Sequence, residues 1–260
     1  MNVIHAITLV VLKEMLRRKD FYVLFVITAL ITVVMGSISI FNDSSIAGYI
    51  KELALLLIWI CSLVIAVTTT ARQLYAEKEN RTIFPLLAKP VSRAQLLIGK
   101  FLGCWIASGL SLLMFYLFVG IVAASREHTI DVGGYCVAML LHWGALAVVV
   151  AMALLGSIVF AAPSSNGTIC LIVSLGILFL AQHLNTVAIH MGGVLGNITY
   201  AIYYLTPRLD WAFSVRQFLI FHDAMPGPGV VGGALLIYAC NAAALVLGAW
   251  LLFRRRALNT

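Results

Sequence analysis

Long apolar runs, separated by short polar segments, divide the chain into stretches that are each long enough to cross a bilayer. A spanning helix needs about 20 predominantly apolar residues, and the runs that qualify are 21–41, 53–71, 96–124, 135–162, 168–189 and 230–253. The third and fourth runs exceed a minimal span, so we expect those helices to tilt or to protrude. The pattern therefore predicts an all-α integral membrane protein with six transmembrane helices, forming a single domain over residues 1–260.

The segment before the first span, residues 1–20, carries a helical pattern of its own. Ile4, Ile7, Val11 and Met15 recur on one face, and polar residues gather on the opposite face. This pattern is typical of a helix that lies along the cytoplasmic interface before the chain enters the bilayer. The alternative is a cytoplasmic extension of the first span.

Composition supports a membrane protein and excludes an ordinary soluble domain. Hydrophobic residues make up 62% of the 260 residues and charged residues only 10%, against roughly 45–50% and 25% in soluble domains. A globule of this composition could not cover its surface with polar groups, so lipid must be the solvent for much of the chain.

The basic residues are placed where they would orient the protein in the membrane. Of the 17 Lys and Arg residues, all but Lys51, Arg126, Arg208 and Arg216 fall before the first span, between spans two and three, or after the last span. Positive residues collect on the cytoplasmic side, so we expect both termini to be cytoplasmic. Because these clusters separate apolar runs, the net charge of +7 does not indicate nucleic-acid binding.

The connection between spans two and three contains strong helix signals. Thr82 can cap a short helix, and Pro85 is tolerated in its first turn because those N–H groups lack intrahelical partners. Pro90 ends that helix. Ser92 and Gln95 have the S-x-x-Q spacing of a capping box, which predicts the start of the next helix.

The short helix in this connection presents apolar side chains between charged ones. The apolar residues are Ile83, Phe84, Leu86 and Leu87, and the flanking charges are Glu77, Glu79, Arg81 and Lys89. We expect such a cytoplasmic apolar surface to be a docking site for another protein. The alternative is a helix lying flat on anionic lipid.

Two other connections have their own signatures. The segment from about residue 190 to 229 contains Tyr200, Tyr203, Tyr204 and Trp211, the aromatic type that gathers at headgroups. Its Pro and Gly residues favour short helices that dip into the outer leaflet, which predicts a re-entrant external segment before span six. Residues 163–167 are expected to form a tight cytoplasmic turn.

Chemistry-bearing residues are scarce within the spans. No predicted span has an acidic residue near its centre, which argues against a self-powered, ion-coupled carrier. Gln182, His183 and Asn185 could line a translocation path, whereas the alternative places them, like His142 and Asn241, in hydrogen bonds between helices or at headgroups. His183 with His190 is a poor metal site, so we expect no bound metal. No Walker-type phosphate-binding motif is present.

Residues 77–103 resemble the permease subunits of type-2 ATP-binding-cassette (ABC) transporters. In that family an acidic stretch precedes a Thr, a short apolar helix, a Pro, a Ser-Arg and a Gly-Lys. The matching positions here are Glu77, Glu79, Thr82, Leu86, Leu87, Pro90, Ser92, Arg93, Gly99 and Lys100. Arg81 stands where the family usually has Gly, and Pro85 is a second departure. The segment 13–18 and the basic tail after Phe253 resemble the family more weakly.

The resemblance implies a mechanism in which this chain does no catalysis. Residues 77–90 would form a coupling helix that docks on a separate ABC ATPase subunit, through Glu77, Glu79, Arg81, Thr82, Ile83, Phe84, Leu86 and Leu87. ATP and Mg would be bound by that partner, and this chain would bind no cofactor. Two permease chains, identical or paralogous, would enclose the path in a bacterial or archaeal cytoplasmic (inner) membrane.

The function expected on this basis is ATP-driven transport, with export as the leading direction. Two alternatives stay open. The chain could be an ABC-type membrane subunit that serves the maturation of an extracytoplasmic enzyme or signalling. It could also be a membrane scaffold without a transport role.

Overall fold

The regular structure of the chain is helical throughout the part described by its computed structural model. That part comprises residues 3–17, 19–37, 45–79, 92–127, 131–190, 194–207, 209, 219–220 and 225–255. The main helices are α1 (Val3–Leu16), α2 (Lys19–Ser37), α3 (Ser45–Glu79), α5 (Arg93–Glu127), α6 (Val132–Val159), α7 (Pro163–His190), α8 (Val194–Leu205) and α11 (Pro228–Arg255). The predicted all-α class is confirmed.

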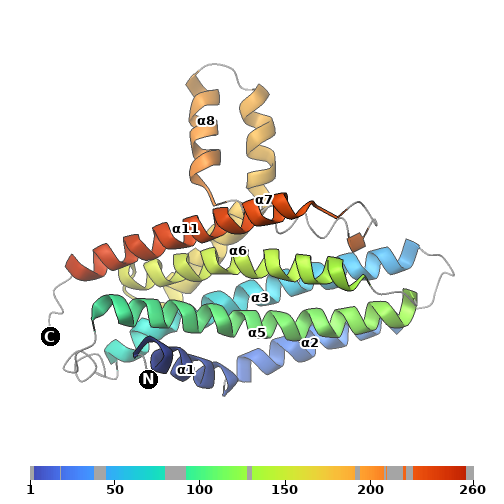
Figure 1. Cartoon of the computed structure of the whole chain (residues 1–260), viewed down its shortest axis with the longest axis horizontal. Helices are drawn as coiled ribbons and strands as arrows, with labels where there is room; N and C mark the ends of the chain where they lie inside the picture. The colour runs from blue at the N-terminus through green and yellow to red at the C-terminus, as the bar shows by residue number, and fades with distance from the viewer. Residues whose placement is uncertain are drawn as a thin grey trace.

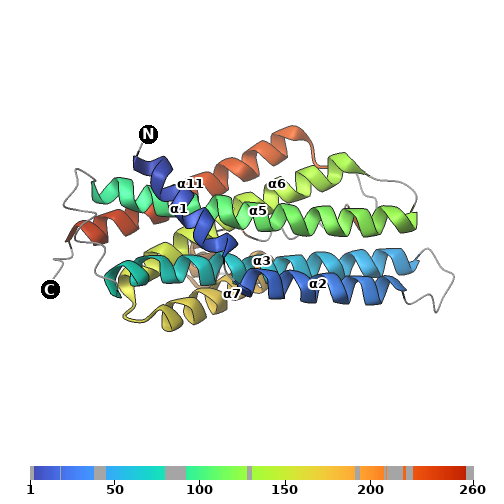
Figure 2. The ribbon, with the colours of Figure 1, turned by 90° about the horizontal axis from the view of Figure 1, so that it is seen from below.

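Helices α2, α3, α5, α6 and α11 run along the long axis of the bundle, as Figure 1 shows. Helix α1 lies obliquely across α5 near one end of the bundle (Figure 2). Helix α8 packs against α7, and α8 projects from the side of the bundle together with the C-terminal part of α7. The start of α1 and the end of α11 lie near the same end of the molecule in both views.

Four of the helices are long and apolar enough to span a membrane over residues that the structure describes. They are Lys51–Tyr75, Arg93–Ala124, Val132–Val159 and Pro228–Arg255. They coincide with the second, third, fourth and sixth predicted spans. The first and fifth predicted spans fall on α2 and α7, whose described apolar stretches, Tyr22–Val34 and Pro163–Phe179, are shorter. Those two crossings stay predictions.

The helix starts follow from local side-chain chemistry. Helix α5 begins with the predicted capping box: Ser92 N–H donates to Gln95 Oε1 at 2.9 Å, and Gln95 N–H donates to Ser92 Oγ at 3.2 Å. Helix α6 begins after Asp131, whose carboxylate accepts from Gly134 N–H at 3.0 Å. Both caps satisfy amide groups that a helix terminus leaves without intrahelical partners.

The predicted turn at 163–167 is wrong. The chain turns at residues 160–162, and α7 already begins at Pro163. Proline is favoured at the first position of a helix, where its missing N–H costs nothing and its fixed φ suits the helix. Asn166 is fully buried inside the first turns of α7, and its amide donates to Ala153 O at 2.9 Å.

A polar cluster joins three helices in the middle of the bundle. His142 of α6 is fully buried, and its Nε2 lies 2.9 Å from Ser62 Oγ of α3. Its Nδ1 lies 3.4 Å from the hydroxyl of Tyr116 on α5, and Trp59 stacks on the imidazole with 4.1 Å between ring centroids. For His142, hydrogen bonding between helices is therefore confirmed.

Trp105 of α5 and Trp143 of α6 form a second link between helices. Each indole N–H donates to the backbone carbonyl of the other tryptophan, at 3.0 and 3.1 Å. The rings stack with 4.5 Å between centroids. A buried indole N–H without a partner would be costly, so this reciprocal arrangement fixes the spacing of the two helices.

Candidate functional site

The predicted docking helix falls between the end of α3 and the start of α5. Residues 80–91 lie outside the described part of the chain, and with them Arg81, Thr82, Ile83, Phe84, Leu86 and Leu87. Glu79 is the last residue of α3 and is described by its backbone alone. The structure therefore shows how the two flanks of this connection are held, and Glu77 is the predicted docking residue whose side chain it describes.

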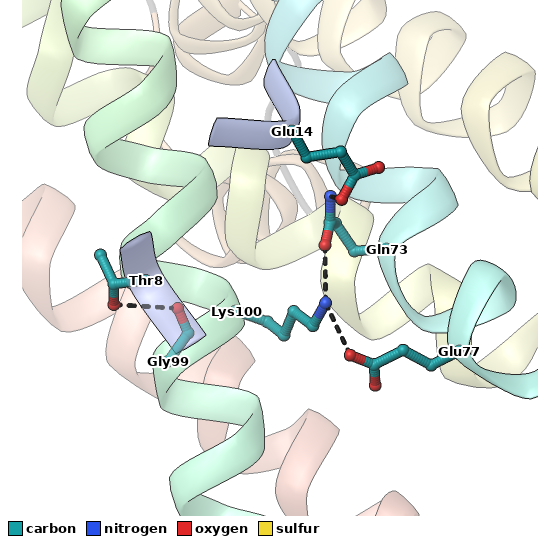
Figure 3. A network of polar contacts seen from close by, with 6 residues as sticks. All are labelled: Thr8, Glu14, Gln73, Glu77, Gly99 and Lys100. Atoms are coloured by element: carbon teal, nitrogen blue, oxygen red, sulfur yellow. Dashed lines mark hydrogen bonds and ion pairs between the residues drawn. The ribbon is translucent and has the colours of Figure 1, made fainter. Parts of the chain in front are cut away.

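A buried ion pair joins the two flanks of the connection. Lys100 Nζ of α5 lies 2.7 Å from Glu77 Oε1 of α3, and the side chains are only 6% and 13% exposed. The same ammonium group donates to Gln73 Oε1 at 2.8 Å (Figure 3). Lysine is seldom buried unless it is paired, and these two acceptors stabilise its charge.

Gln73 extends this network to the N-terminal helix. While its oxygen accepts from Lys100, its Nε2 donates to Glu14 Oε2 of α1 at 3.1 Å. Gln73 is itself buried, at 4% exposure. One amide side chain therefore bridges α1 and α5 through α3, and the orientation of each polar group is fixed by its neighbours.

Helix α1 packs closely on α5 because α5 carries two glycines one turn apart. A Cβ atom on Gly99 would come within 3.0 Å of Ile7 Cβ, and one on Gly103 within 2.7 Å of Val11 Cβ. The Thr8 hydroxyl lies 2.9 Å from Ile4 O and 3.3 Å from Gly99 O. The apolar face predicted for residues 4–15 is thus present, and it is covered by protein: Ile7, Val11 and Met15 are at most 9% exposed.

Arg93 ties the start of α5 to the end of α11. Its Nη1 donates to Phe253 O at 3.0 Å and lies 3.4 Å from Arg254 O, and its guanidinium lies 5.6 Å from the centroid of the Phe253 ring. The last carbonyls of a helix lack intrahelical donors and carry a partial negative charge. Arg93 supplies both a hydrogen-bond donor and a positive charge at the C-terminal end of α11.

Tyr75 ties the end of α3 to the turn between α6 and α7. Its hydroxyl donates to the carbonyl of Phe160, the residue that directly follows α6. Gln73, Tyr75 and Glu77 thus each make a separate contact from the last two turns of α3. We call these residues, together with the groups to which they bond, the linked end. Its members are Glu14, Gln73, Tyr75, Glu77, Arg93 and Lys100.

The linked end joins α3 and α5 to three other parts of the bundle. A movement of the 80–91 connection would act on α3 and α5 directly, and through them on α1, the α6–α7 turn and α11. Packed helices and hydrogen-bonded side chains carry such coupling between distant sites. Within the described residues, no group of three or more His, Cys, Asp or Glu side chains could hold a metal ion.

The predicted path residues occupy a different part of the molecule from the linked end. Gln182, His183 and Asn185 lie in the C-terminal half of α7, and their side chains fall outside the description. Their role in a path therefore stays a prediction.

Sequence reasoning missed part of the linked end. Gln73 and Tyr75 carry no motif, because their partners lie on other helices, and Glu14 belongs only to the weakly resembling segment 13–18. Gly99 and Lys100 are part of the pattern quoted above, and the structure supplies a physical reason for each. Gly99 has no side chain, so α1 can pack closely on α5, and Lys100 pairs with Glu77 to join the two flanks of the connection.

Comparison with known proteins identifies one family. The sequence model of the family described as "ABC-2 family transporter protein" matches residues 9–256. No curated protein matches the chain at a significant level.

Proposed function

The chain belongs to the ABC-2 family of transporter proteins, and on this premise we propose that it is the membrane permease subunit of an ATP-driven exporter. The family match covers nearly the whole chain, from residue 9 to residue 256. Membership implies the membrane as the environment and an ABC ATPase as a partner. ATP and Mg would be bound by that ATPase, and this chain would contribute movement rather than chemistry.

The observation that carries the proposal is the attachment of both flanks of the 80–91 connection to the rest of the bundle. A docking helix transmits force only if its base is rigid. Here Lys100 and Glu77 close the base, and Arg93 fixes the α5 flank to α11. A helix lying passively on lipid would need no such attachment.

Within this proposal the docking residues take separate roles. Ile83, Phe84, Leu86 and Leu87 supply the apolar contact with the ATPase, and Thr82 caps the helix that bears them. Glu79 and Arg81 form a charged rim that selects the partner. Glu77 acts from inside the bundle, since its carboxylate is bonded to Lys100.

We further propose six crossings with both termini cytoplasmic, in the inner membrane of a bacterium or archaeon. Helix α1, the flanks of the 80–91 connection, the α6–α7 turn and the end of α11 gather at one end of the bundle. All of them would lie on one side of the membrane in a six-span arrangement. The basic residues that flank these segments support a cytoplasmic position for that side.

A second permease chain, identical or paralogous, would complete the transport path. Gln182, His183 and Asn185 of α7 would line it, and the external segment that contains α8 would re-enter the outer leaflet before α11. Because the ATPase would supply the energy, the path needs no acidic residue at the centre of any span.

Co-purification with the ATPase tests the proposal. Phe84→Asp and Leu87→Asp should each abolish retention of the ATPase, because an acidic side chain cannot be buried unpaired in an apolar groove. Leu258→Asp, the same kind of change in the predicted cytoplasmic tail, should leave retention unchanged. Wild-type retention by both Phe84→Asp and Leu87→Asp would show that docking occurs elsewhere. A complex that hydrolyses ATP in liposomes without moving solute would favour enzyme maturation or signalling.

A further inference from the structure

A groove of about 680 Å³ lies between α1 and α5, beside the contact of Ile7 and Val11 with the two glycines. Its lining consists of Val3, Ile4, His5 and Thr8 from α1, and Gln95, Leu102 and Ile106 from α5. Its volume falls within the range of small-molecule sites. None of the functions assigned to the linked end uses this groove.

The groove is polar at one end and apolar at the other along α5. Gln95 lies at the start of α5, Leu102 two turns further and Ile106 one turn beyond that. At 1.5 Å per residue, Gln95 and Ile106 are roughly 16 Å apart along the helix axis. This distance is about half of a 30 Å hydrocarbon core. With Gln95 at headgroup level, as in the orientation proposed above, Ile106 would lie near the bilayer centre.

The polar end offers hydrogen-bond donors and no acid. Gln95 Oε1 accepts from Ser92 N–H in the helix cap, so its amide NH₂ is the part able to donate to a ligand. His5 is exposed and can donate from its ring. Thr8 uses its hydroxyl on Ile4 O and Gly99 O, so it closes the groove rather than binding a ligand. Two donors, with no carboxylate among the described lining residues, suit a phosphate.

We propose that this groove binds one phospholipid of the cytoplasmic leaflet, with its phosphate at His5 and Gln95 and an acyl chain along Leu102 and Ile106. The direction of the polarity selects this occupant: an amphiphile whose head lies at the interface and whose tail points to the bilayer centre matches both ends of the groove. The inference rests on the proposed placement of the linked end at the cytoplasmic interface, and it is independent of the ATPase and of the direction of transport.

A lipid in this groove would fill the space beside α1 and hold it against α5. Leu102 and Ile106 are half-buried, so part of each side chain still faces the groove. Since α1 reaches Gln73 through Glu14, the bound lipid would also brace the linked end. Removal of the lipid should therefore loosen α1 before it affects the central helices.

Native mass spectrometry of the full chain, purified in mild detergent and titrated with phosphatidylglycerol or phosphatidylethanolamine, tests the proposal. The wild-type chain should retain one phospholipid at concentrations where further adducts are lost. Leu102→Trp fills the groove and should weaken that first binding step at least tenfold. Leu247→Trp is the matched control: it lies at a similar depth on α11, is 58% exposed, and should bind like the wild type.

A double variant, His5→Ala with Gln95→Glu, guards against misfolding of the tryptophan variant. It removes both donors, keeps at position 95 an oxygen that can accept from Ser92 N–H in the capping box, and leaves the apolar end intact, so it should also lose the first lipid. Equal first-step binding in wild type, Leu102→Trp and the double variant would mean annular lipid only and would overturn the proposal. Retention of detergent alone by the wild type would overturn it too. ATPase co-purification tests the proposed function separately, because none of these changes touches residues 80–91.

Discussion

Lys100 and Glu77 form an ion pair, 2.7 Å between Nζ and Oε1, that closes the base of the connection between α3 and α5. The pair is shielded from water, and Gln73 shares the ammonium group. Through Gln73 it also reaches Glu14 of α1. The two helices that flank the predicted docking segment are thus held together at the place where an ATPase would push on them.

Lys100→Met tests this pair. The change removes the ammonium group that lies 2.7 Å from Glu77 Oε1, and removing one partner of a buried ion pair costs about 3–5 kcal/mol. For a chain of this size the unfolding temperature in detergent should fall by about 6 °C or more. Transport per ATP hydrolysed should fall as well, because the base of the docking segment is loosened.

Two further variants make the Lys100 experiment specific. Lys100→Met combined with Glu77→Gln removes both charges of the pair and should recover part of the lost stability. Lys13→Met, at an exposed position of α1, should change the unfolding temperature little. If Lys100→Met unfolds at the wild-type temperature, the pair does not hold the flanks together.

The contact of α1 with Gly103 leads to a second prediction. In Gly103→Ala the new Cβ would lie 2.7 Å from Val11 Cβ, and overpacking of this kind costs about 1–3 kcal/mol. Amide hydrogen exchange within α1 should become faster. Val11→Gly removes the Cβ that the new methyl group meets, so Gly103→Ala should cause no further exchange in α1 when Val11→Gly is already present.

Gly120→Ala is the matched control for that experiment, because a Cβ there would meet nothing within 4 Å on the same helix. It should leave exchange in α1 unchanged. Equal exchange in Gly103→Ala and Gly120→Ala would contradict the close contact of α1 with α5.

The reciprocal hydrogen bonds of Trp105 and Trp143 give a third prediction. Trp105→Phe and Trp143→Phe each remove one N–H donor while keeping an aromatic ring at the contact. Each should lower the free energy of unfolding by about 0.6–1.5 kcal/mol. Trp250→Phe, outside this pair, should cost less, and a Trp105→Phe variant as stable as Trp250→Phe would show that the bonds contribute nothing.

Reporter fusions test the proposed orientation. A reporter that is active only in the cytoplasm should be active when fused after Asn166 and inactive when fused after Arg126, because one span separates the two positions. Equal cytoplasmic activity at both sites would contradict the six-span arrangement, whatever the function of the chain.

Structural features that depend only on neighbouring residues could be predicted from local patterns in the sequence. The long apolar runs located the helices, and the spacing of Ser92 and Gln95 predicted a capping box whose two hydrogen bonds the structure contains. The apolar face of residues 4–15 was also predicted. The turn near Pro163 was misplaced because a Pro-Ser-Ser-Asn-Gly sequence can begin a helix as well as form a loop.

Contacts between residues far apart in the chain could not be predicted from the sequence. Lys100 was counted among the basic residues that orient the chain, and nothing local shows that it is paired with Glu77 and Gln73 of α3. Tyr75 and Phe160 are bonded only because α3 ends beside the α6–α7 turn. A single sequence shows which residues are polar, whereas the packing of helices decides which polar residues meet.

The proposed function depends on contact between the 80–91 segment and an ATPase, and site-specific photo-cross-linking measures that contact directly. A photoreactive amino acid replaces Phe84 in the assembled complex, and the control replaces Leu140, which is 44% exposed on α6. We expect a covalent adduct with the ATPase from position 84 and none from position 140. An intact complex that gives no ATPase adduct from position 84, or an equal adduct from position 140, would contradict it.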